Sequence, residues 1–159
     1  FGTGHHPTTK MMLEKMENLK FYNKKIFDFG SGSGILSIAA KKLGAKTVTA
    51  LETDELAINS AKENIKFSSL KDIDIRHASI ENLPRSDKYD IILANISSRI
   101  IINFSEMIYS RLIKDGFLLC SGILSSDMDK TLKKLERSGF IFLDFIQEED
   151  WCCLELGIA

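Results

Sequence analysis

Short apolar runs alternate with longer segments of helical period along this chain, and this alternation restricts the fold more than any other feature. The runs at 25–29, 47–52 and 89–95 are nearly continuous in apolar character. Such strands are typical of a mainly parallel sheet that helices cover on both faces. Right-handed crossovers then predict a doubly wound α/β fold. The chain has 159 residues, the length of a single domain over 1–159.

The individual elements are expected from apolar periodicity and from the cap and turn residues at their ends. Asp54 and Asp127 are expected to be helix N-caps, and Asp115–Gly116 is expected to form a turn. Helices are predicted at 7–19, 34–43, 54–66, 100–113 and 127–138. Strands are predicted at 25–29, 47–52, 72–77, 89–95, 117–121, 140–147 and 151–156.

A glycine-rich turn, Gly30-Ser31-Gly32-Ser33-Gly34, connects the first predicted strand to the following helix. Glycines are needed where the backbone takes positive φ or where a ligand lies against it. Acidic Glu52 ends the next predicted strand, and its carboxylate can accept hydrogen bonds from both hydroxyls of a ribose. The turn and the acid together predict a nucleoside ligand.

The spacing of the three glycines distinguishes two nucleoside ligands. A dinucleotide site has the pattern G-x-G-x-x-G/A, whose third small residue packs helix against strand. Counted from Gly30, the third place is bulky Ile35; counted from Gly32, it is Ser37, but the turn would then begin late. S-adenosylmethionine carries no pyrophosphate, so a G-x-G-x-G turn suits it better. Gly30, Gly32 and Gly34 are therefore expected to bind this cofactor.

Two further polar residues mark the carboxyl ends of predicted strands, where ligands bind in doubly wound sheets. Asp28 is expected to orient the turn or to receive the ammonium of the cofactor, directly or through water; the alternative is a solvated carboxylate. Asn95 has an acceptor and donors, which suits a residue that orients an amine. Its alternative role is to form a turn. We expect Asn95 to contribute to both cofactor binding and catalysis.

Both ends of the chain carry unusual segments. Residues 1–9 are expected to form a flexible lid, with Thr9 bonded to the cofactor and Pro7 starting a helix. His5 and His6 have no carboxylate partner nearby in the sequence, so a metal is not expected. The acidic run 148–150 precedes the only Trp, and it is either a solvated turn or a rim that attracts a cationic substrate.

Overall charge and cysteine content limit the partners and the compartment. The net charge of −1 argues against extensive nucleic-acid binding but leaves a local contact open. Cys120, Cys152 and Cys153 form no C-x-x-C pair, which indicates buried thiols in a reducing cytosol. No apolar run approaches the roughly 20 residues that span a bilayer, so membrane insertion is not expected.

Six segments resemble one known family. They read FGTGHHPTT at 1–9, DFGSGSGILSIAA at 28–40, LETD at 51–54, ANI at 94–96, SGIL at 121–124 and EEDW at 148–151. In this order they resemble the catalytic domain of the ribosomal protein L-eleven methyltransferase family, PrmA. The opening and the ANI segment are much more specific than the glycine turn.

The resemblance implies a class I S-adenosylmethionine-dependent methyltransferase (Rossmann-like) fold, with seven strands of which the last is antiparallel. It implies cofactor contacts at Thr9, Gly30, Glu52 and Asn95. It also implies methylation of lysine ε-amines and the N-terminal amine of a large-subunit ribosomal protein in the cytoplasm. The family's N-terminal substrate-recognition domain is expected to be absent from this chain. Glu52 stands where the family has Asp, so the carboxylate is moved by one methylene.

Three other functions remain open at this point. A methyltransferase for nucleic-acid bases usually has an Asn/Asp-Pro-Pro-aromatic strand end, whereas Asn95 is followed by Ile-Ser-Ser without a stacking ring. A nicotinamide oxidoreductase is disfavoured by Ile35. The third alternative is a nucleoside-binding module without catalytic activity.

Overall fold

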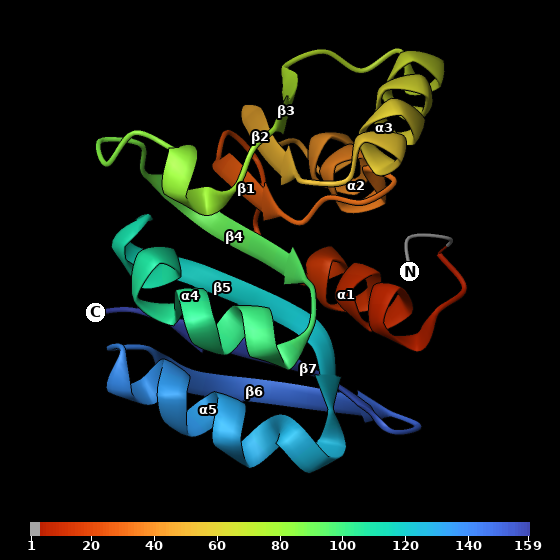
Figure 1. Ribbon diagram of the computed structural model, residues 1–159. Helices are drawn as coiled ribbons and strands as arrows, with labels where there is room; N and C mark the ends of the chain where they lie inside the picture. Colours follow the sequence, from red (N-terminus) through yellow and green to blue (C-terminus); the bar gives the residue numbers. More distant parts are fainter. Residues whose placement is uncertain (1–3) are drawn as a thin grey trace.

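The computed structural model describes residues 4–159, so the first three residues of the expected lid lie outside it. A seven-stranded sheet in the order β3-β2-β1-β4-β5-β7-β6 runs through the protein (Figure 1). Strand β7 is antiparallel to both of its neighbours, and the other pairs are parallel. The predicted fold class is confirmed. The strands are β1 Lys25–Phe29, β2 Thr47–Glu52, β3 Ile73–His77, β4 Tyr89–Asn95, β5 Leu112–Leu124, β6 Ile141–Glu148 and β7 Trp151–Gly157.

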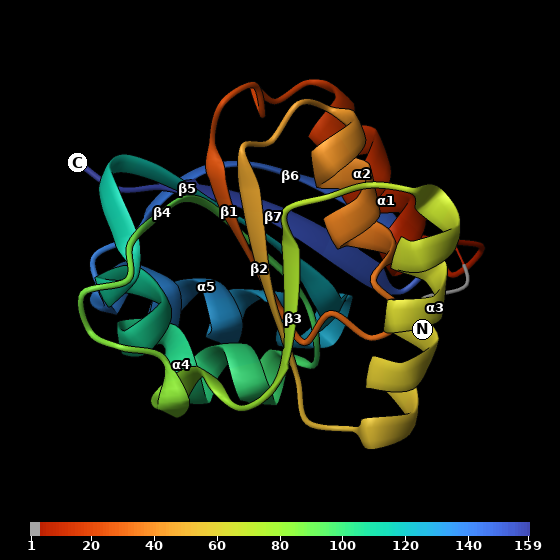
Figure 2. The same ribbon diagram turned by 90° about the horizontal axis from the view of Figure 1, so that it is seen from above.

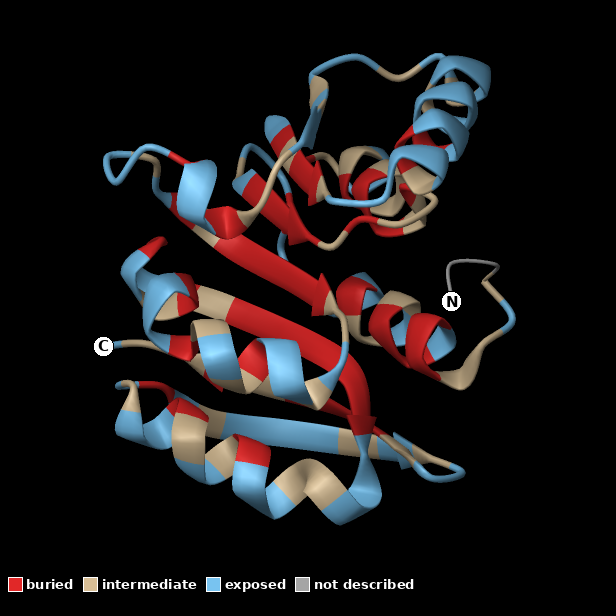
Figure 3. Ribbon diagram, in the orientation of Figure 1, coloured by how far each residue is buried: buried red, intermediate tan, exposed pale blue. Residues whose placement is uncertain are grey.

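The helices cover both faces of the sheet (Figure 2). Helices α1, α2 and α3 lie on one face, and α4 and α5 lie side by side on the other. Burial is concentrated in the central strands, whereas edge strand β6 and the outer face of α5 are largely exposed (Figure 3). The helices are α1 Pro7–Glu17, α2 Ile35–Lys42, α3 Glu55–Ser68, α4 Ser98–Ser110 and α5 Met128–Arg137, with short 3-10 turns η1 Ile80–Asn82 and η2 Ser125–Asp127.

Each face of the sheet has its own apolar core. Met12, Met16 and Leu36 pack from α1 and α2 onto one face, with each methionine fully buried. Ile101 and Ile108 pack from α4 onto the other face. Burying a side chain of this size stabilises the fold by roughly 1.5–3 kcal/mol, so the helices hold the sheet rigid from both sides.

The strand order reverses between β1 and β4, and this is where the fold places a ligand. Strand β1 pairs with β2 on one side and with β4 on the other, with Asp28 opposite Leu93. The chain leaves β1 toward α2 on one face and leaves β4 toward α4 on the other. A crevice opens between the two carboxyl ends for this reason.

The predicted end of α4 is wrong. The helix ends at Ser110, and β5 begins already at Leu112, so Asp115 and Gly116 lie inside the strand. Asp115 has a φ of 59°, and the pairing of β4 with β5 shifts register between Tyr89 and Ile91, so the expected turn is a local irregularity of the strand. The helix ends where the chain begins to pair with β4, because the N–H of Tyr89 donates to the carbonyl of Arg111 over 2.8 Å and Tyr89 pairs with Leu112.

The two predicted aspartate caps have different outcomes. Asp54 is confirmed as the N-cap of α3, because its carboxylate accepts from the N–H groups of Leu56 and Ala57 at 2.8 and 3.2 Å. Asp127 precedes α5 as predicted, but its side chain caps nothing. It accepts instead from Ser98 Oγ at 2.8 Å, which ties the start of α5 to the start of α4.

The three cysteines are free and buried, as the sequence predicts. Burial raises the pKa of the Cys120 thiol to about 12, so it remains a protonated, unreactive core thiol. Within residues 4–159, no helix is long and apolar enough to cross a bilayer.

Candidate cofactor and methyl-transfer site

A cavity of about 580 Å³ opens at the carboxyl ends of β1, β2 and β4. Its volume is within the usual range for small-molecule sites. Most of the lining is apolar, and the polar side chains are few and converge on it, an arrangement typical of a ligand site. The lining residues are Phe29, Gly30, Gly32, Leu51, Glu52, Thr53, Ala78, Ser79, Asn95, Ile96, Ser97, Ile100 and Phe104.

The three glycines of the turn all have positive φ, but each meets a different environment. A Cβ on Gly30 would lie 2.4 Å from Ile96 Cγ2, and one on Gly34 would lie 3.2 Å from Ala61 Cβ. A Cβ on Gly32 would meet no other atom of residues 4–159 within 4 Å. Gly32 therefore leaves open the space that a ligand can fill, whereas Gly34 permits close packing of α3. Gly30 and Gly32 line the cavity, and Gly34 does not.

Glu52 is held by main-chain donors at the rim of the cavity. Its Oε2 accepts from the N–H of Gly32 at 2.9 Å, and its Oε1 accepts from Thr53 and Asp54 at 2.8 and 3.0 Å. A carboxylate has about four acceptor positions, so three of them are in use. A ribose with two hydroxyls would compete with at least one of these donors, and two of the donor residues, Gly32 and Thr53, line the cavity.

Asn95 is fixed at one end of its amide and unpartnered at the other. Its Nδ2 donates to Thr9 Oγ1 over 3.1 Å, while its Oδ1 is buried and has no hydrogen-bond partner within residues 4–159. A buried acceptor without a partner costs about 1–3 kcal/mol, so this oxygen is prepared for a donor from a ligand. Thr9 is fully buried and does not line the cavity. Its observed contact is with Asn95.

Asp28 lies behind the glycine turn, fully buried and outside the cavity lining. Ser37 Oγ donates to Asp28 Oδ2 over 2.6 Å, and Oδ1 has no partner among the described residues. Burial raises the pKa of this carboxyl to about 6; the Ser37 hydrogen bond opposes that rise, and Glu52 adds to it. The alternative of a solvated carboxylate at the strand end is wrong, because the side chain is fully buried.

The start of α1 and the acidic hairpin lie at the same edge of the sheet. His6 is the N-cap of α1, and its ring contacts Trp151 edge-on at 5.2 Å. Lys10 pairs with Glu148 at 2.9 Å, so one charge of the acidic run is neutralised. Strand β7 begins at Trp151, beside the carboxyl end of β5. Residues 4–159 contain no cluster of three or more His, Cys, Asp or Glu side chains that could hold a metal.

Gly122 and Ile96 are structural residues of the site that sequence reasoning did not identify. Gly122 has a φ of 81°, and a Cβ there would lie 2.3 Å from the carbonyl oxygen of Ile96. Ile96 is thus confined between the backbones of Gly30 and Gly122. The glycine in the segment SGIL was the only signal in the sequence, and its partner lies on another strand end.

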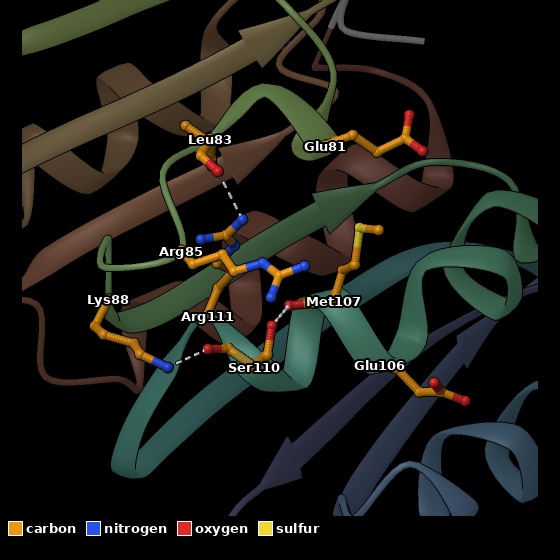
Figure 4. A pocket seen from close by; sticks show the side chains of 8 residues that line it. All are labelled: Glu81, Leu83, Arg85, Lys88, Glu106, Met107, Ser110 and Arg111. Atoms are coloured by element: carbon orange, nitrogen blue, oxygen red, sulfur yellow. Dashed lines mark hydrogen bonds between the residues drawn. The ribbon is translucent and has the colours of Figure 1, made fainter.

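A second cavity of about 530 Å³ lies near the amino end of β4, away from this edge (Figure 4). Its basic residues include Arg111, which is buried and donates to the carbonyls of Leu83 and Pro84. Lys88 donates to the carbonyl of Ser110 at the end of α4. These cations already stabilise main-chain carbonyls, so we assign this cavity a structural role.

Comparison with known proteins identifies the family to which the chain belongs. The family model described as ribosomal protein L11 methyltransferase (PrmA) matches residues 1–157. The chain belongs to the PrmA family. This confirms the resemblance drawn from the six sequence segments.

Individual PrmA relatives agree with the family match. The chain is 42% identical over 159 residues to the ribosomal protein L11 methyltransferase of Prochlorococcus marinus (strain MIT 9301). It is 39% identical to that of Staphylococcus haemolyticus (strain JCSC1435). These matches cover 97% of this chain but 52% and 49% of the relatives, so the chain spans about half their length.

A solved structure agrees as well. The fold superposes on the crystal structure of ribosomal protein L11 methylase from Lactobacillus delbrueckii subsp. bulgaricus with a TM-score of 0.90 and 30% identity. This match covers 96% of the present chain and 79% of the solved one.

Proposed function

We propose that this protein is an S-adenosylmethionine-dependent N-methyltransferase that methylates lysine ε-amines and the N-terminal α-amine of a large-subunit ribosomal protein. The observation that carries the proposal is the unpartnered, buried Oδ1 of Asn95 at the edge of an apolar cavity. An amine must be oriented there by an acceptor, and Asn95 offers one whose direction the Thr9 hydrogen bond fixes.

The residues of the cavity fit the proposed cofactor. Gly32 leaves backbone space free for its amino-acid end, and Glu52 has a carboxylate at the ribose position. Phe29, Ile100 and Phe104 form an apolar wall that suits an adenine ring. When bound, S-adenosylmethionine supplies an electrophilic methyl group on a sulfonium, together with a positive charge.

The chain's own contribution is to position and desolvate the attacking amine. Lysine begins with a pKa near ~10.4 and must lose its proton before it can attack. A cationic neighbour and a partly apolar site lower that pKa. Asn95 Oδ1 then accepts a hydrogen bond from the neutral amine and aims its lone pair at the methyl group, and the lost proton passes to water. Such positioning can contribute roughly 7–11 kcal/mol to the lowering of the barrier.

Substrate choice belongs to the proposal as well. The relatives' names specify ribosomal protein L11, and we assign the same substrate to this protein, in the cytoplasm. Because the chain spans about half the length of these relatives, we propose that recognition of the ribosomal protein needs a further domain.

The direct test is transfer of a labelled methyl group from S-adenosylmethionine to purified ribosomal protein L11, read by mass spectrometry of each amine. The proposal predicts labelled lysines and a labelled N-terminus with the whole protein, and labelling about 100-fold slower with the Asn95→Ala variant. Label in ribosomal RNA or in small amines, with none in the ribosomal protein, would contradict the substrate assignment.

A further inference from the structure

A groove between α4 and α5 carries a row of cations that the proposed methyl transfer does not use. It has a volume of about 560 Å³, and Ile102 of α4 lines it on one side. Its charged side chains are four cations and the single carboxylate of Asp129. The whole chain has a net charge of −1, so the positive charge of this groove is opposite in sign to the net charge of the protein. The four cations are Lys130, Lys133, Lys134 and Arg137.

The helical period places these cations on one side of α5. Positions i, i+3, i+4 and i+7 face the same way on a helix, while the opposite side, with Thr131 and Leu135, is fully buried. Lys134 pairs with Glu106 of α4 at 2.8 Å. Lys130, Lys133 and Arg137 are exposed, and none of them takes part in an ion pair within residues 4–159.

The groove continues toward the edge of the sheet at which the carboxyl ends of the parallel strands lie. A smaller cavity of about 230 Å³ shares Ile102 and Lys130 with it and adds Ser98, Arg99 and Asp127. Arg99 adds a further cation to the row, and the carboxylate of Asp127 accepts a hydrogen bond from Ser98 Oγ. Helix α4 begins after the carboxyl end of β4, and α5 begins after the carboxyl end of β5, so both start at the same edge of the sheet (Figure 1). The basic row therefore starts at this edge and leads away from it.

We propose that this groove, lined by Arg99, Lys130, Lys133 and Arg137, binds the phosphate backbone of RNA. Both side-chain types suit phosphate, since lysine binds it as a mobile point charge and arginine binds it through two parallel hydrogen bonds. The groove has no aromatic ring for base stacking, so binding is independent of base sequence. The choice of RNA rests on the proposed function, because a ribosomal protein occurs together with ribosomal RNA.

The test is fluorescence anisotropy of a labelled 16-nucleotide oligouridylate with the protein at several salt concentrations. Lys130→Ala combined with Lys133→Ala should weaken binding about tenfold at 0.1 M salt and reduce the slope of log K against log salt by about 1.4. The matched control is Lys62→Ala combined with Lys66→Ala, two exposed lysines of α3, which should change neither quantity.

Equal losses in both double variants, no loss in either, or no binding by the unaltered protein would overturn the proposal. Displacement of the RNA by a poly-glutamate peptide of equal charge would assign the groove to an acidic protein instead. S-adenosylmethionine binding, measured by calorimetry, should be the same in both variants, which shows that the fold is intact. RNA binding without methyl transfer would contradict the proposed function but support RNA binding by the groove. Methyl transfer without RNA binding would contradict only the role of the groove.

Discussion

Asn95 combines a fixed donor with an open acceptor, and this asymmetry defines its role at the residue scale. The hydrogen bond to Thr9 orients the amide, and Oδ1 is left without a partner in the described structure. Sequence reasoning placed Asn95 at a strand end and Thr9 at the start of a helix. Their contact could not be predicted, because it joins residues 86 positions apart.

Replacing Asn95 with alanine should lower turnover about 100-fold, the scale expected when a reacting group loses its orientation. Cofactor binding should change much less, because the cavity has many other walls. Steady-state kinetics with the ribosomal protein would separate kcat from KM. Asn59→Ala, which removes an exposed amide of α3, is the control and should retain full turnover. Full turnover by the Asn95→Ala variant would remove Asn95 from the mechanism.

Asp28 gives a pH dependence whose sign follows from its burial. The pKa of its carboxyl is raised from 3.8 to about 6, because burial disfavours the charged form. The folded protein therefore binds this proton more tightly than the unfolded chain does. The stabilising contribution is complete below about pH 4 and is lost as the pH rises through about 6.

The Asp28→Asn variant should lack this loss. Between pH 4 and pH 7 its free energy of unfolding should rise by about 2–3 kcal/mol relative to the unaltered protein. Urea denaturation at each pH measures the difference. Ser37→Ala removes a hydrogen bond that lowers this pKa, so it should move the inflection to higher pH. A difference that is constant across this range would contradict the assignment.

At the scale of elements, the ends of three strands meet at the site and pack closely around Ile96. Ile96 follows β4 and lies against the backbones of Gly30 and Gly122. The glycine turn was predictable because strand, glycines and helix are adjacent in sequence. The approach of Gly122 to Ile96 was not predictable, because it depends on how β4 and β5 pair. The early end of α4 has the same cause, since Leu112 already pairs with Tyr89 of β4.

Two glycine substitutions should separate packing from ligand space. Gly122→Ala places a Cβ 2.3 Å from a carbonyl oxygen at positive φ, so it should cost about 3 kcal/mol of stability. Gly32→Ala has open space around it and should cost about 1 kcal/mol. The same substitution should weaken S-adenosylmethionine binding strongly, because its methyl group enters the ligand space. Thermal unfolding and calorimetry measure the two effects.

A large loss of stability in Gly32→Ala without a loss of cofactor affinity, together with normal stability in Gly122→Ala, would contradict these two roles. It would show that Gly32 is needed for the backbone alone and that the site tolerates displacement of Ile96.

At the scale of the whole molecule, alternating strand and helix patterns were sufficient to predict the doubly wound sheet. The local signal of Asp54 marked the start of α3 correctly. The basic groove was not predicted, because the net charge averages it with acidic surface elsewhere. Its cations become one surface only when α4 and α5 lie side by side on the sheet.

The cofactor is the central claim of this account, and isothermal titration calorimetry with S-adenosylmethionine and with NAD tests it most directly. We predict one S-adenosylmethionine bound per chain, with affinity reduced by Gly32→Ala, and no measurable heat with NAD. Binding of NAD in preference to S-adenosylmethionine would contradict the claim and return the glycine turn to a dinucleotide role.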